Sequence, residues 1–365
     1  MQRLLVITGS MNAGGAETFL MKIYRNMDRT KYQMDFALGI REKGVYDDEI
    51  IRMGGRIYYV PPKTRNLVAF YKGIKEIVRD NHYNSVMRMS QFTISALDLF
   101  AAKQGGAQHL IMRSTNSQVV EGKKQQIINI LFSWMPKVIP TTRFAPSTEA
   151  AEFLFGKGCI TNGKAIIIHN AVPVEKFVFC EEKRKAKRKE LGVSDENFVV
   201  CHMGRFEHQK NHEFLIDVFY EIKKKKDSAI LVLVGDGSLF ESIKKKVEIL
   251  GLSDSVQFLG IRKDIPEILM ASDIDIFPSF YEGMPNTIIE AQAAGLKCIV
   301  SDTITKEVAI TDRVHFMSLN SSAKEWADMA CSVEINHTET YEEFKAQKYD
   351  IDSVVNQFVD TVFDV

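Results

Sequence analysis

Short apolar runs alternate with longer amphipathic stretches along the first part of the chain. Residues 4–8 read Leu-Leu-Val-Ile-Thr, which is typical of a buried strand, and a loop with two glycines follows. We expect a helix over residues 16–27, further strands over 34–38 and 56–60, and a second helix over 68–79. In the first of these helices the apolar side chains recur at the spacing of one helix face: Phe19, Leu20, Ile23 and Met27. This alternation predicts βα units around a parallel sheet.

A second series of the same kind begins near residue 197. We expect helices over residues 212–226 and 238–250. The expected strands cover residues 198–203, 229–234, 256–259, 275–278 and 297–301. Two such series predict an α/β protein with two domains of ordinary size, although the halves share no visible sequence repeat.

A charge-dense segment separates the two series. Residues 172–197 contain the run Glu181 to Glu190, in which Ala186 is the only uncharged residue. We expect the front of this segment to be the interdomain linker and residues 183–191 to be an exposed helix that leads into the second domain. Contact of the lysines with anionic lipid is the alternative, which four glutamates in or beside the run disfavour.

The end of the chain predicts an amphipathic helix. Apolar residues recur at helical spacing between residues 351 and 363, as they do in a helix that packs on a protein core. Membrane attachment through this segment is disfavoured, because its polar face lacks lysine and arginine.

Composition and charge narrow the class of protein. Hydrophobic residues make up 45% and charged residues 26% of the 365 residues, as in a soluble globular protein. Basic and acidic residues both number 47, which argues against a general nucleic-acid-binding protein. The N-terminal apolar run is too short for a secretory signal, and no apolar stretch approaches the ~20 residues of a membrane span. Because the five cysteines are scattered and form no Cys-x-x-Cys pair, we expect a cytoplasmic protein, with peripheral contact at the inner face of the membrane left open.

The most informative segment is residues 279–295, which read SFYEGMPNTIIEAQAAG. Pro285 is tolerated at the first position of a helix, and Gly295 is typical of the residue that follows a helix end. Glu282 is therefore expected in the loop before this helix, and Glu290 on its second turn.

This segment suits a ligand that carries both phosphate and hydroxyl groups. The free N–H groups of Asn286 and Thr287 would point out of the helix N-terminus and form an anion site. The carboxylates of Glu282 and Glu290 would not hold phosphate, but they suit the hydroxyl groups of a ribose or a sugar.

Residues 202–211 (HMGRFEHQKN) carry a second set of polar groups, at the end of the first strand of domain two. Gly204 would allow a tight turn, and Arg205 and Lys210 would place two cations on one loop. Ligands of open α/β sheets bind at the carboxyl ends of the strands, so both segments fall on the same sheet edge. The two cations and a helix N-terminus could neutralise a diphosphate and stabilise the charge on a departing phosphate, as a metal does elsewhere.

The order and spacing of these motifs resemble family 4 of the retaining glycosyltransferases over most of the chain. The most specific element is the pair Glu282 and Glu290, with seven residues between them. The other elements are Gly14-Gly15-Ala16-Glu17, Asn170-Ala171-Val172, Gly204-Arg205 with Lys210-Asn211, Val234-Gly235-Asp236-Gly237 and Pro278-Ser279.

The resemblance implies a fold and an activity. The fold is GT-B: α/β, with two Rossmann-like domains facing across a cleft and a C-terminal helix that crosses back to the N-terminal domain. We expect an acceptor-side domain over residues 1–172, a donor-side domain over 173–345 and the returning helix over 346–365. The implied activity moves a sugar from a nucleotide-diphosphate sugar to a glycan or lipid-linked acceptor, with retained configuration and without a metal or other cofactor, in polysaccharide or glycolipid biosynthesis.

The resemblance also implies the catalytic residues. Arg205 and Lys210 would grip the donor diphosphate, and Glu290 would accept hydrogen bonds from the ribose. Glu282 would contact the transferred sugar. The mechanism implied is attack on the same face as the leaving diphosphate, whose oxygen helps to deprotonate the acceptor. Glu282 is therefore not assigned the covalent role that carboxylates have in retaining glycosidases.

The remaining donor contacts are implied in the same way. Gly15, from the opposite domain, would close over the phosphates, and Ile261 would lie against the nucleobase. The full donor-binding set is Gly15, Gly204, Ile261, Gly283, Met284, Asn286, Thr287 and Glu290.

One departure from the family concerns the first domain, where members often carry a histidine close to the reacting sugar. The corresponding residues 111–117 read IMRSTNS and contain no histidine. Arg113 and Thr115 are the candidates to replace it, unless the true match is displaced by some residues. His109 lies nearby and is not assigned the role.

Two sequence patterns resemble metal-binding motifs, and two other functions are alternatives to the transferase. Asp273-Ile274-Asp275 spells the DxD signature of metal-dependent transferases, but the apolar residues around it indicate a helix-to-strand junction. His208 and His212 have the spacing of zinc ligands on a helix, without an evident third ligand. The alternative functions are a non-catalytic nucleotide-sugar-binding or regulatory partner, and a nucleotide-sugar epimerase or hydrolase.

Overall fold

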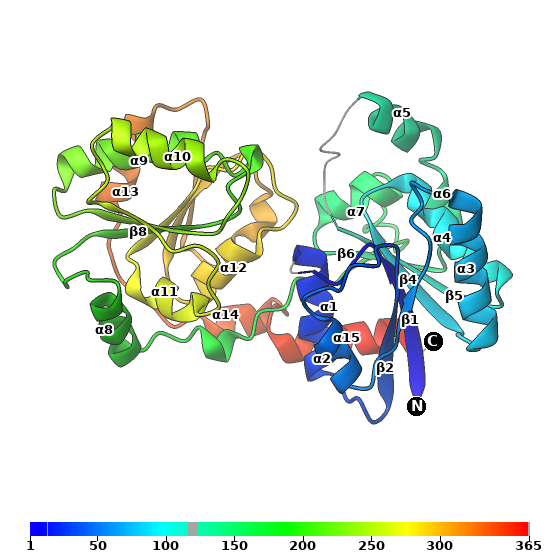
Figure 1. Cartoon of the computed structure of the whole chain (residues 1–365). Helices are drawn as coiled ribbons and strands as arrows, with labels where there is room; N and C mark the ends of the chain where they lie inside the picture. The colour runs from blue at the N-terminus through cyan, green and yellow to red at the C-terminus, as the bar shows by residue number, and fades with distance from the viewer. Residues whose placement is uncertain (13, 116–122, 364–365) are drawn as a thin grey trace. The chain divides into compact units, whose positions relative to one another are not determined.

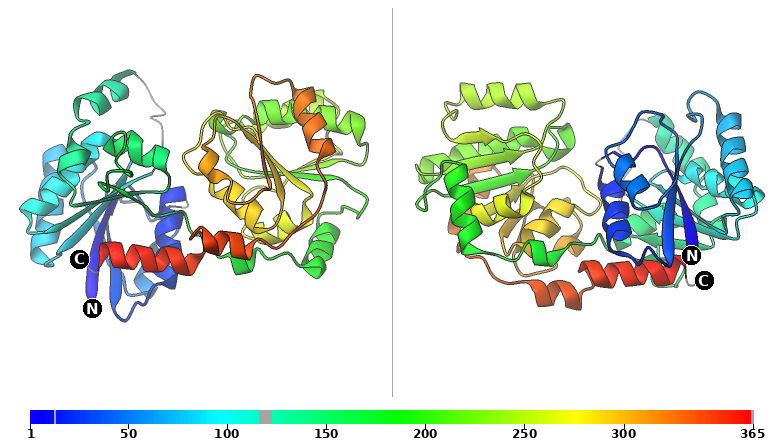
Figure 2. Two further views of the ribbon diagram at one scale, coloured as in Figure 1. Left: turned by 180° about the vertical axis from the view of Figure 1, so that it is seen from behind. Right: turned by 60° about the horizontal axis from the view of Figure 1, so that its bottom comes forward.

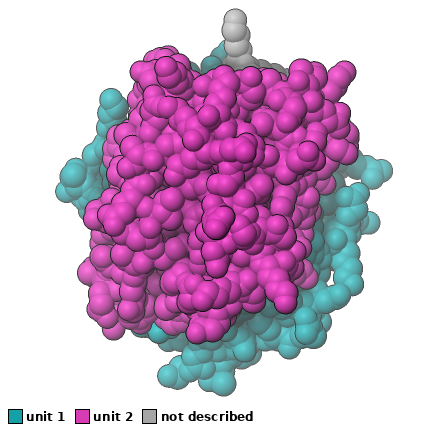
Figure 3. All heavy atoms as spheres, turned by 90° about the vertical axis from the view of Figure 1, so that its left-hand side faces the viewer, with its two compact units in different colours: residues 1–171, 351–365 teal, residues 172–350 magenta. Residues whose placement is uncertain are grey.

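The computed structural model describes residues 1–12, 14–115 and 123–363, which form two compact units, each built around its own sheet (Figure 1). Unit 1 comprises residues 1–171 and 351–365, and unit 2 comprises residues 172–350 (Figure 3). The last helix of the chain therefore belongs to the unit that contains the N-terminus.

The sheet of unit 1 has the strand order β3-β2-β1-β4-β5-β6-β7, and every neighbouring pair is parallel. Its strands are β1 (Gln2–Thr8), β2 (Tyr32–Leu38), β3 (Ile57–Tyr59), β4 (Ser85–Ser90), β5 (His109–Ser114), β6 (Thr142–Ala145) and β7 (Ile166–Ile167). A parallel sheet needs cover on both faces, and helices supply it on each side (Figure 2).

The two faces of this sheet bury separate cores. One core lies under α1 (Gly15–Asn26), α2 (Asp47–Arg52) and the C-terminal helix α15 (Ile351–Val362). The other lies under α3 (Leu67–Asp80), α4 (Ala96–Gln104), α6 (Met135–Val138) and α7 (Thr148–Phe155). A further helix, α5 (Lys123–Leu131), contacts the short turn η1 (Thr93–Ser95) that follows β4.

The predicted packing of the C-terminal helix on the N-terminal domain is confirmed. Phe358 of α15 is fully buried, and its ring lies 6.2 Å from that of Phe19 on α1 and 6.0 Å from that of Phe144 on β6. The helix begins at Ile351, later than the expected residue 346, because α14 (Tyr341–Ala346) occupies the preceding residues as a separate helix.

The sheet of unit 2 has the order β10-β9-β8-β11-β12-β13, again with every pair parallel. Its strands are β8 (Val199–Met203), β9 (Ile230–Val234), β10 (Val256–Phe258), β11 (Ile274–Phe277), β12 (Lys297–Ser301) and β13 (Val314–Met317). Its other helices are α8 (Glu181–Glu190), α9 (His212–Lys225), α10 (Phe240–Ile249), α11 (Ile265–Ala271), α12 (Asn286–Ala293) and α13 (Ala323–Ser332). None of the helices that the structure describes is long and apolar enough to cross a bilayer.

These two sheets confirm the predicted α/β class with two Rossmann-like domains. The apolar pattern did not identify five strands, most of which are short or contain polar residues: β4, β5, β6, β7 and β13. β4 reads SVMRMS, β6 reads TRFA, and β7 has only 2 residues. Such strands are defined by their neighbours in the sheet and not by their own composition.

The helix predicted after the linker is mostly exposed, as expected, but the prediction is wrong for two of its charged residues. In α8 the side chains of Lys187 and Arg188 are buried, and Arg188 is only 1% exposed. The Arg188 guanidinium donates to the carbonyls of Ala271 at 2.8 Å, Ser194 at 2.6 Å and Asn197 at 2.7 Å. Cations are favoured where a helix ends, and the carbonyl end of α11 provides such a place. The run is therefore a docking element of unit 2.

Candidate functional site

The strand order of unit 2 creates a switch point between β8 and β11. From β8 the chain continues to β9 and β10 on one side, and β11 starts the series that continues on the other side. In such sheets the loops that leave the two central strands diverge and leave a crevice at their carboxyl ends, where ligands bind. Both polar segments identified in the sequence follow these two strands.

Direct hydrogen bonds join the two loops. The N–H of Phe280 donates to the carbonyl of Gln209 at 2.9 Å, and the Gln209 amide donates to the carbonyl of Tyr281 at 2.9 Å. The Asn211 amide donates to the carbonyl of Pro278 at 3.1 Å. The segments after β8 and β11 therefore form one structured surface.

An ion pair lies at the centre of this surface. Lys210 Nζ is 2.8 Å from Glu282 Oε1, and the two side chains are only 15% and 12% exposed. Lys210 Nζ also lies 4.4 Å from the centre of the Phe277 ring, a cation–π geometry. The lysine is thus held in a defined position at the mouth of the switch point.

Three glycines allow the loops around Lys210 to pack closely. A Cβ at Gly204 would lie 3.1 Å from the Lys210 stem. Gly235, after β9, has φ 141° and approaches the Gly204 carbonyl so closely that a side chain would collide with it. A Cβ at Gly237 would come within 2.6 Å of the Phe206 carbonyl oxygen. A side chain at Gly235 or Gly237 would therefore collide with the backbone of the loop that carries Lys210, and one at Gly204 would crowd the Lys210 side chain itself.

Two further predicted contacts are exposed. Arg205 has an exposed side chain, while Phe206 beside it is buried and its N–H donates to the Asp236 carbonyl at 3.0 Å. Ile261, in the loop after β10, has an exposed apolar side chain. Both side chains are therefore accessible to a ligand.

The helix that carries Glu290 begins one residue later than expected. Pro285 precedes the first helical residue, Asn286, and Gly295 follows the helix with φ 69°. Glu290 lies on the second turn and is half-buried. Met284 is buried in the core of unit 2, so only its backbone and that of the buried Gly283 can face a ligand.

The start of α12 carries polar atoms that are shielded from solvent. Asn286 Oδ1 and Thr287 Oγ1 are buried and have no hydrogen-bond partner among the described residues. Leaving such atoms unpaired costs about 1–3 kcal/mol each, which a ligand with donor groups would relieve. This is the position where the sequence predicted an anion site.

A layer of buried ionisable groups lies beneath Lys210, and the sequence analysis did not identify it. Asp275 pairs in register with Cys201 on β8 and Cys298 on β12, and both of its carboxyl oxygens are buried without a hydrogen-bond partner among the described residues. Burial raises the pKa of Asp275 to about 8. Burial also lowers the pKa of His212 to about 4 and that of His202 well below its ordinary value. This layer is therefore mostly uncharged at neutral pH.

The raised pKa of Asp275 predicts that the stability of the protein depends on pH. Between the unfolded pKa of 3.8 and the folded pKa of about 8, the native state binds the extra proton, so stability falls as pH rises through this window. We expect Asp275→Asn to remove this loss of stability. The free energy of unfolding of the wild type should then fall with pH more steeply than that of the variant, by up to about 1.4 kcal/mol per pH unit. Urea unfolding of both proteins from pH 5 to pH 8 measures it.

The exposed Asp254 provides the matched control for that measurement. Asp254→Asn should follow the wild-type curve at every pH. Parallel curves for Asp275→Asn and wild type would show that Asp275 is already ionised in the native state.

The DxD pattern has the structural role that the sequence predicted. Helix α11 ends at Ala271 and β11 begins at Ile274, so Asp273 lies at the junction between them. Its carboxylate accepts from the backbone N–H of Val199 at 2.7 Å and from Arg184 at 2.7 Å. The rings of His208 and His212 stack instead on Phe280 and Phe206.

Unit 1 holds the predicted first-domain residues. Gly15 is the first residue of α1, and a Cβ there would meet no heavy atom within 4 Å. Arg113 is 2% exposed, donates to Asn170 Oδ1 at 2.7 Å and lies 3.8 Å from the Phe19 ring centre. Burial lowers the pKa of Arg113 to about 9. The structure thus turns Arg113 into the core, and the half-buried Thr115 is the better candidate to replace the histidine; residues 116 and 117 lie outside the described residues.

Comparison with known proteins connects this geometry to an enzyme family. Residues 183–350 match the family described as glycosyl transferases group 1. The chain is 31% identical over 332 residues to the putative glycosyltransferase EpsF of Bacillus subtilis, covering 90% of this chain and 86% of that protein. It is 30% identical over 282 residues to the UDP-Gal:alpha-D-GlcNAc-diphosphoundecaprenol alpha-1,3-galactosyltransferase of Escherichia coli, covering 74% and 72% of the two chains. The structure of HepE from Anabaena in complex with UDP and glucose matches all of both chains with a TM-score of 0.79 at 17% identity.

Proposed function

The chain belongs to the group 1 glycosyltransferases, and we propose that it transfers a sugar from a nucleoside-diphosphate donor to a glycan or lipid-linked acceptor with retention of configuration. The observation that carries the proposal is the joined pair of loops after β8 and β11. They hold Lys210 against Glu282 beside the start of α12. The proposed catalytic residues are Arg205, Lys210 and Glu282.

The proposed chemistry needs charge stabilisation on the leaving group. The acceptor hydroxyl oxygen forms a bond to the anomeric carbon while the bond from that carbon to the diphosphate oxygen breaks. The departing diphosphate takes the acceptor proton on the same face of the sugar. Arg205 and Lys210, with the free N–H groups of α12, neutralise the charge that develops there without a metal ion. Glu282 holds Lys210 in the free enzyme and accepts hydrogen bonds from the sugar in the complex.

The relatives narrow the proposed substrates. The Escherichia coli protein acts on UDP-galactose and a diphosphoundecaprenol-linked sugar, as its name states, and HepE binds UDP. We propose a uridine-diphosphate sugar as the donor and a polyprenyl-diphosphate-linked glycan as the acceptor. The exposed Ile261 would contact the base and Glu290 the ribose. An action in polysaccharide or glycolipid biosynthesis follows from such an acceptor.

Loss of the Glu290 carboxylate should weaken donor binding. We expect Glu290→Ala to lower affinity for the donor by roughly 10-fold or more, because a charge-assisted hydrogen bond contributes about 1.5–3 kcal/mol. Calorimetric titration with UDP-glucose, UDP-galactose and UDP-N-acetylglucosamine measures the effect. The exposed Glu248 on α10 is the matched control, and Glu248→Ala should bind as wild type does.

The same experiment separates the proposed transferase from its rivals. Equal donor affinity for Glu290→Ala and wild type would refute the ribose contact. Donor binding without turnover over a panel of polyprenyl-diphosphate glycans would indicate a regulatory binding protein. Product formed without any acceptor would indicate an epimerase or hydrolase. Full turnover in excess chelator, with an α-linked product from an α-linked donor, would support the metal-independent retaining reaction.

A further inference from the structure

An apolar stripe on unit 1 faces solvent instead of a core. We define it as Ile127, Ile130, Leu131, Trp134 and Val138, which lie three or four residues apart or adjacent along α5, the turn after it and α6. Their side chains are between 54% and 74% exposed. Apolar residues at this spacing normally mark the buried face of a helix. Here the apolar side chains face solvent instead of a core. The sequence analysis did not identify this stripe.

The orientation of the stripe is fixed by the opposite side of α5. The buried Asn129 anchors the helix, because its side-chain oxygen accepts from the N–H of Thr93 at 3.2 Å and its carbonyl accepts from the Thr93 hydroxyl at 3.1 Å. Ile127 and Ile130, which lie two residues before and one residue after Asn129, are exposed. An outward apolar stripe on an anchored helix is a surface that needs a partner.

An apolar groove continues the stripe onto α4. The groove has a volume of about 430 Å³, and Trp134 and Val138 are among the residues that line it. Helix α4 contributes Leu97, Lys103 and the exposed Phe100 to the same lining. The exposed apolar area is thus continuous over α4, α5 and α6.

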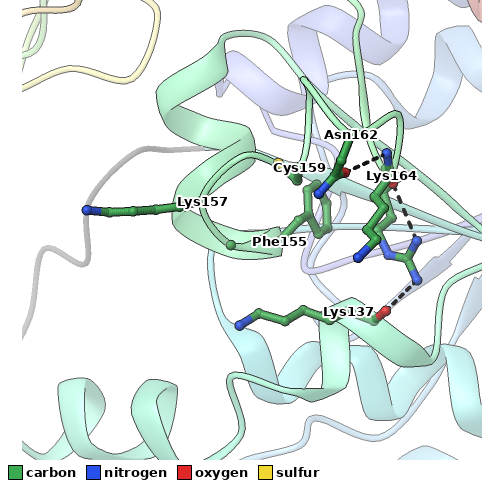
Figure 4. A pocket seen from close by; sticks show the side chains of 8 residues that line it. Lys137, Phe155, Lys157, Cys159, Asn162 and Lys164 are labelled. Atoms are coloured by element: carbon green, nitrogen blue, oxygen red, sulfur yellow. Dashed lines mark hydrogen bonds between the residues drawn. The ribbon is translucent and has the colours of Figure 1, made fainter.

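A basic pocket borders the same helix α6. It has a volume of about 290 Å³ and is lined by Lys137, Arg143, Lys157 and Lys164 among others. In Figure 4 the side chains of Lys137 and Lys157 extend to the same side of the pocket. None of the three lysines forms an ion pair with a described residue.

Backbone carbonyls hold Arg143 without neutralising its charge. Its guanidinium donates to the carbonyls of Pro136 at 2.8 Å, Lys137 at 2.7 Å and Pro140 at 2.8 Å. No carboxylate of a described residue pairs with it, so the pocket keeps a net positive charge in a chain whose formal net charge is zero. The pocket therefore favours anionic groups at the edge of the apolar stripe.

We propose that the apolar stripe and the basic pocket together form a docking surface for a bilayer that contains anionic phospholipid. The apolar side chains would enter the interface, Trp134 would lie at the headgroup level, and the lysines would contact lipid phosphates. A second copy of the chain fits less well, because a symmetric contact through the stripe would bring two cationic pockets towards each other. This inference rests on the proposed function, because action on a lipid-linked acceptor is the reason for the protein to contact a membrane. The test of the surface itself requires no acceptor.

The fluorescence of Trp134 reports directly on binding to vesicles. The chain has two tryptophans, and Trp326 is fully buried in unit 2 with its N–H donated to the Ser318 carbonyl. We expect vesicles of phosphatidylglycerol and phosphatidylcholine in equal parts to shift the emission of the full-length protein to shorter wavelength. Vesicles of phosphatidylcholine alone should give little shift. Trp134→Phe should sediment with the anionic vesicles and lose the spectral change.

Variants of the two parts test the surface separately. Ile130→Ser combined with Leu131→Ser should weaken vesicle binding at least 10-fold, whereas Ile249→Ser, at an equally exposed apolar residue of unit 2, should not. Lys137→Glu combined with Lys157→Glu should weaken binding by more than fivefold for each lysine, since each contributes about 1 kcal/mol near an anionic surface. Lys244→Glu with Lys245→Glu is the control for charge.

Three outcomes would overturn the docking surface. They are unchanged emission with anionic vesicles, equal sedimentation of the Ile130→Ser/Leu131→Ser variant, and a concentration-dependent dimer that this variant abolishes, which would assign the stripe to a second copy. Calorimetric donor titration of the same variants without vesicles should equal wild type. The docking surface and the transferase proposal can therefore fail independently.

Discussion

Replacing Lys210 with alanine should lower kcat/KM for sugar transfer by roughly 10²–10³-fold, which is the usual effect of removing one preorganised group that stabilises a leaving oxyanion. Lys210 is held by Glu282 at 2.8 Å and by the face of the Phe277 ring. A group fixed in this way needs no reorganisation when charge develops on the diphosphate. Initial rates with a UDP-sugar donor and a polyprenyl-diphosphate glycan measure the loss.

The ion pair between Lys210 and Glu282 affects how the loss of activity in Lys210→Ala is interpreted. Lys210→Ala leaves the Glu282 carboxylate unpaired beside the diphosphate, so part of the loss would come from repulsion. The double variant Lys210→Ala/Glu282→Ala removes the repulsion but also a sugar contact. Lys244→Ala, on the exposed face of α10, should retain wild-type activity. Near wild-type kcat/KM in Lys210→Ala would show that the lysine has a structural role only.

Arg188→Met should cause the largest loss of stability among single replacements in α8, about 3 kcal/mol. The methionine fills a similar volume but leaves the buried Ala271 carbonyl without its donor and removes the guanidinium from the half-buried carbonyls of Ser194 and Asn197. It also takes a cation away from the buried Asp273 carboxylate, which lies 3.5 Å from Arg188. For a unit of this size the melting temperature should fall by roughly 6–12 °C. Urea unfolding followed by Trp326 fluorescence in a Trp134→Phe background reports unit 2 alone.

Lys189→Met is the matched control for this prediction, because the neighbouring side chain is exposed on the same helix. It should change the free energy of unfolding by less than about 0.5 kcal/mol. Arg188→Lys should fall between the two, since an ammonium keeps the charge but cannot reach three carbonyls with the planar guanidinium geometry. Equal stability of Arg188→Met and wild type would mean that α8 is not docked in solution.

The candidate site illustrates how parallel sheets make local sequence informative about distant contacts. Residues 202–211 and 279–295 are far apart in the chain, yet each follows a central strand. All strands of unit 2 run parallel, so their carboxyl ends share one edge and the polar groups that follow them meet there. The positions of Lys210 and Glu282 could therefore be expected before any coordinates. Their direct ion pair could not, because it depends on the hydrogen bonds between the two loops.

The sequence by itself determined the βα alternation, the two-domain α/β class and the positions of the polar motifs at strand ends. These follow from hydrophobic periodicity and from Gly and Pro at helix ends, which are local properties. Only the tertiary structure decided which charged and apolar side chains are buried. Arg188 and Arg113 turn inward, Asp275 lies uncharged under Lys210, and the stripe around Trp134 faces outward. The physical reason is that burial depends on which element packs against a residue, and the spacing of residues along one element does not specify its neighbour.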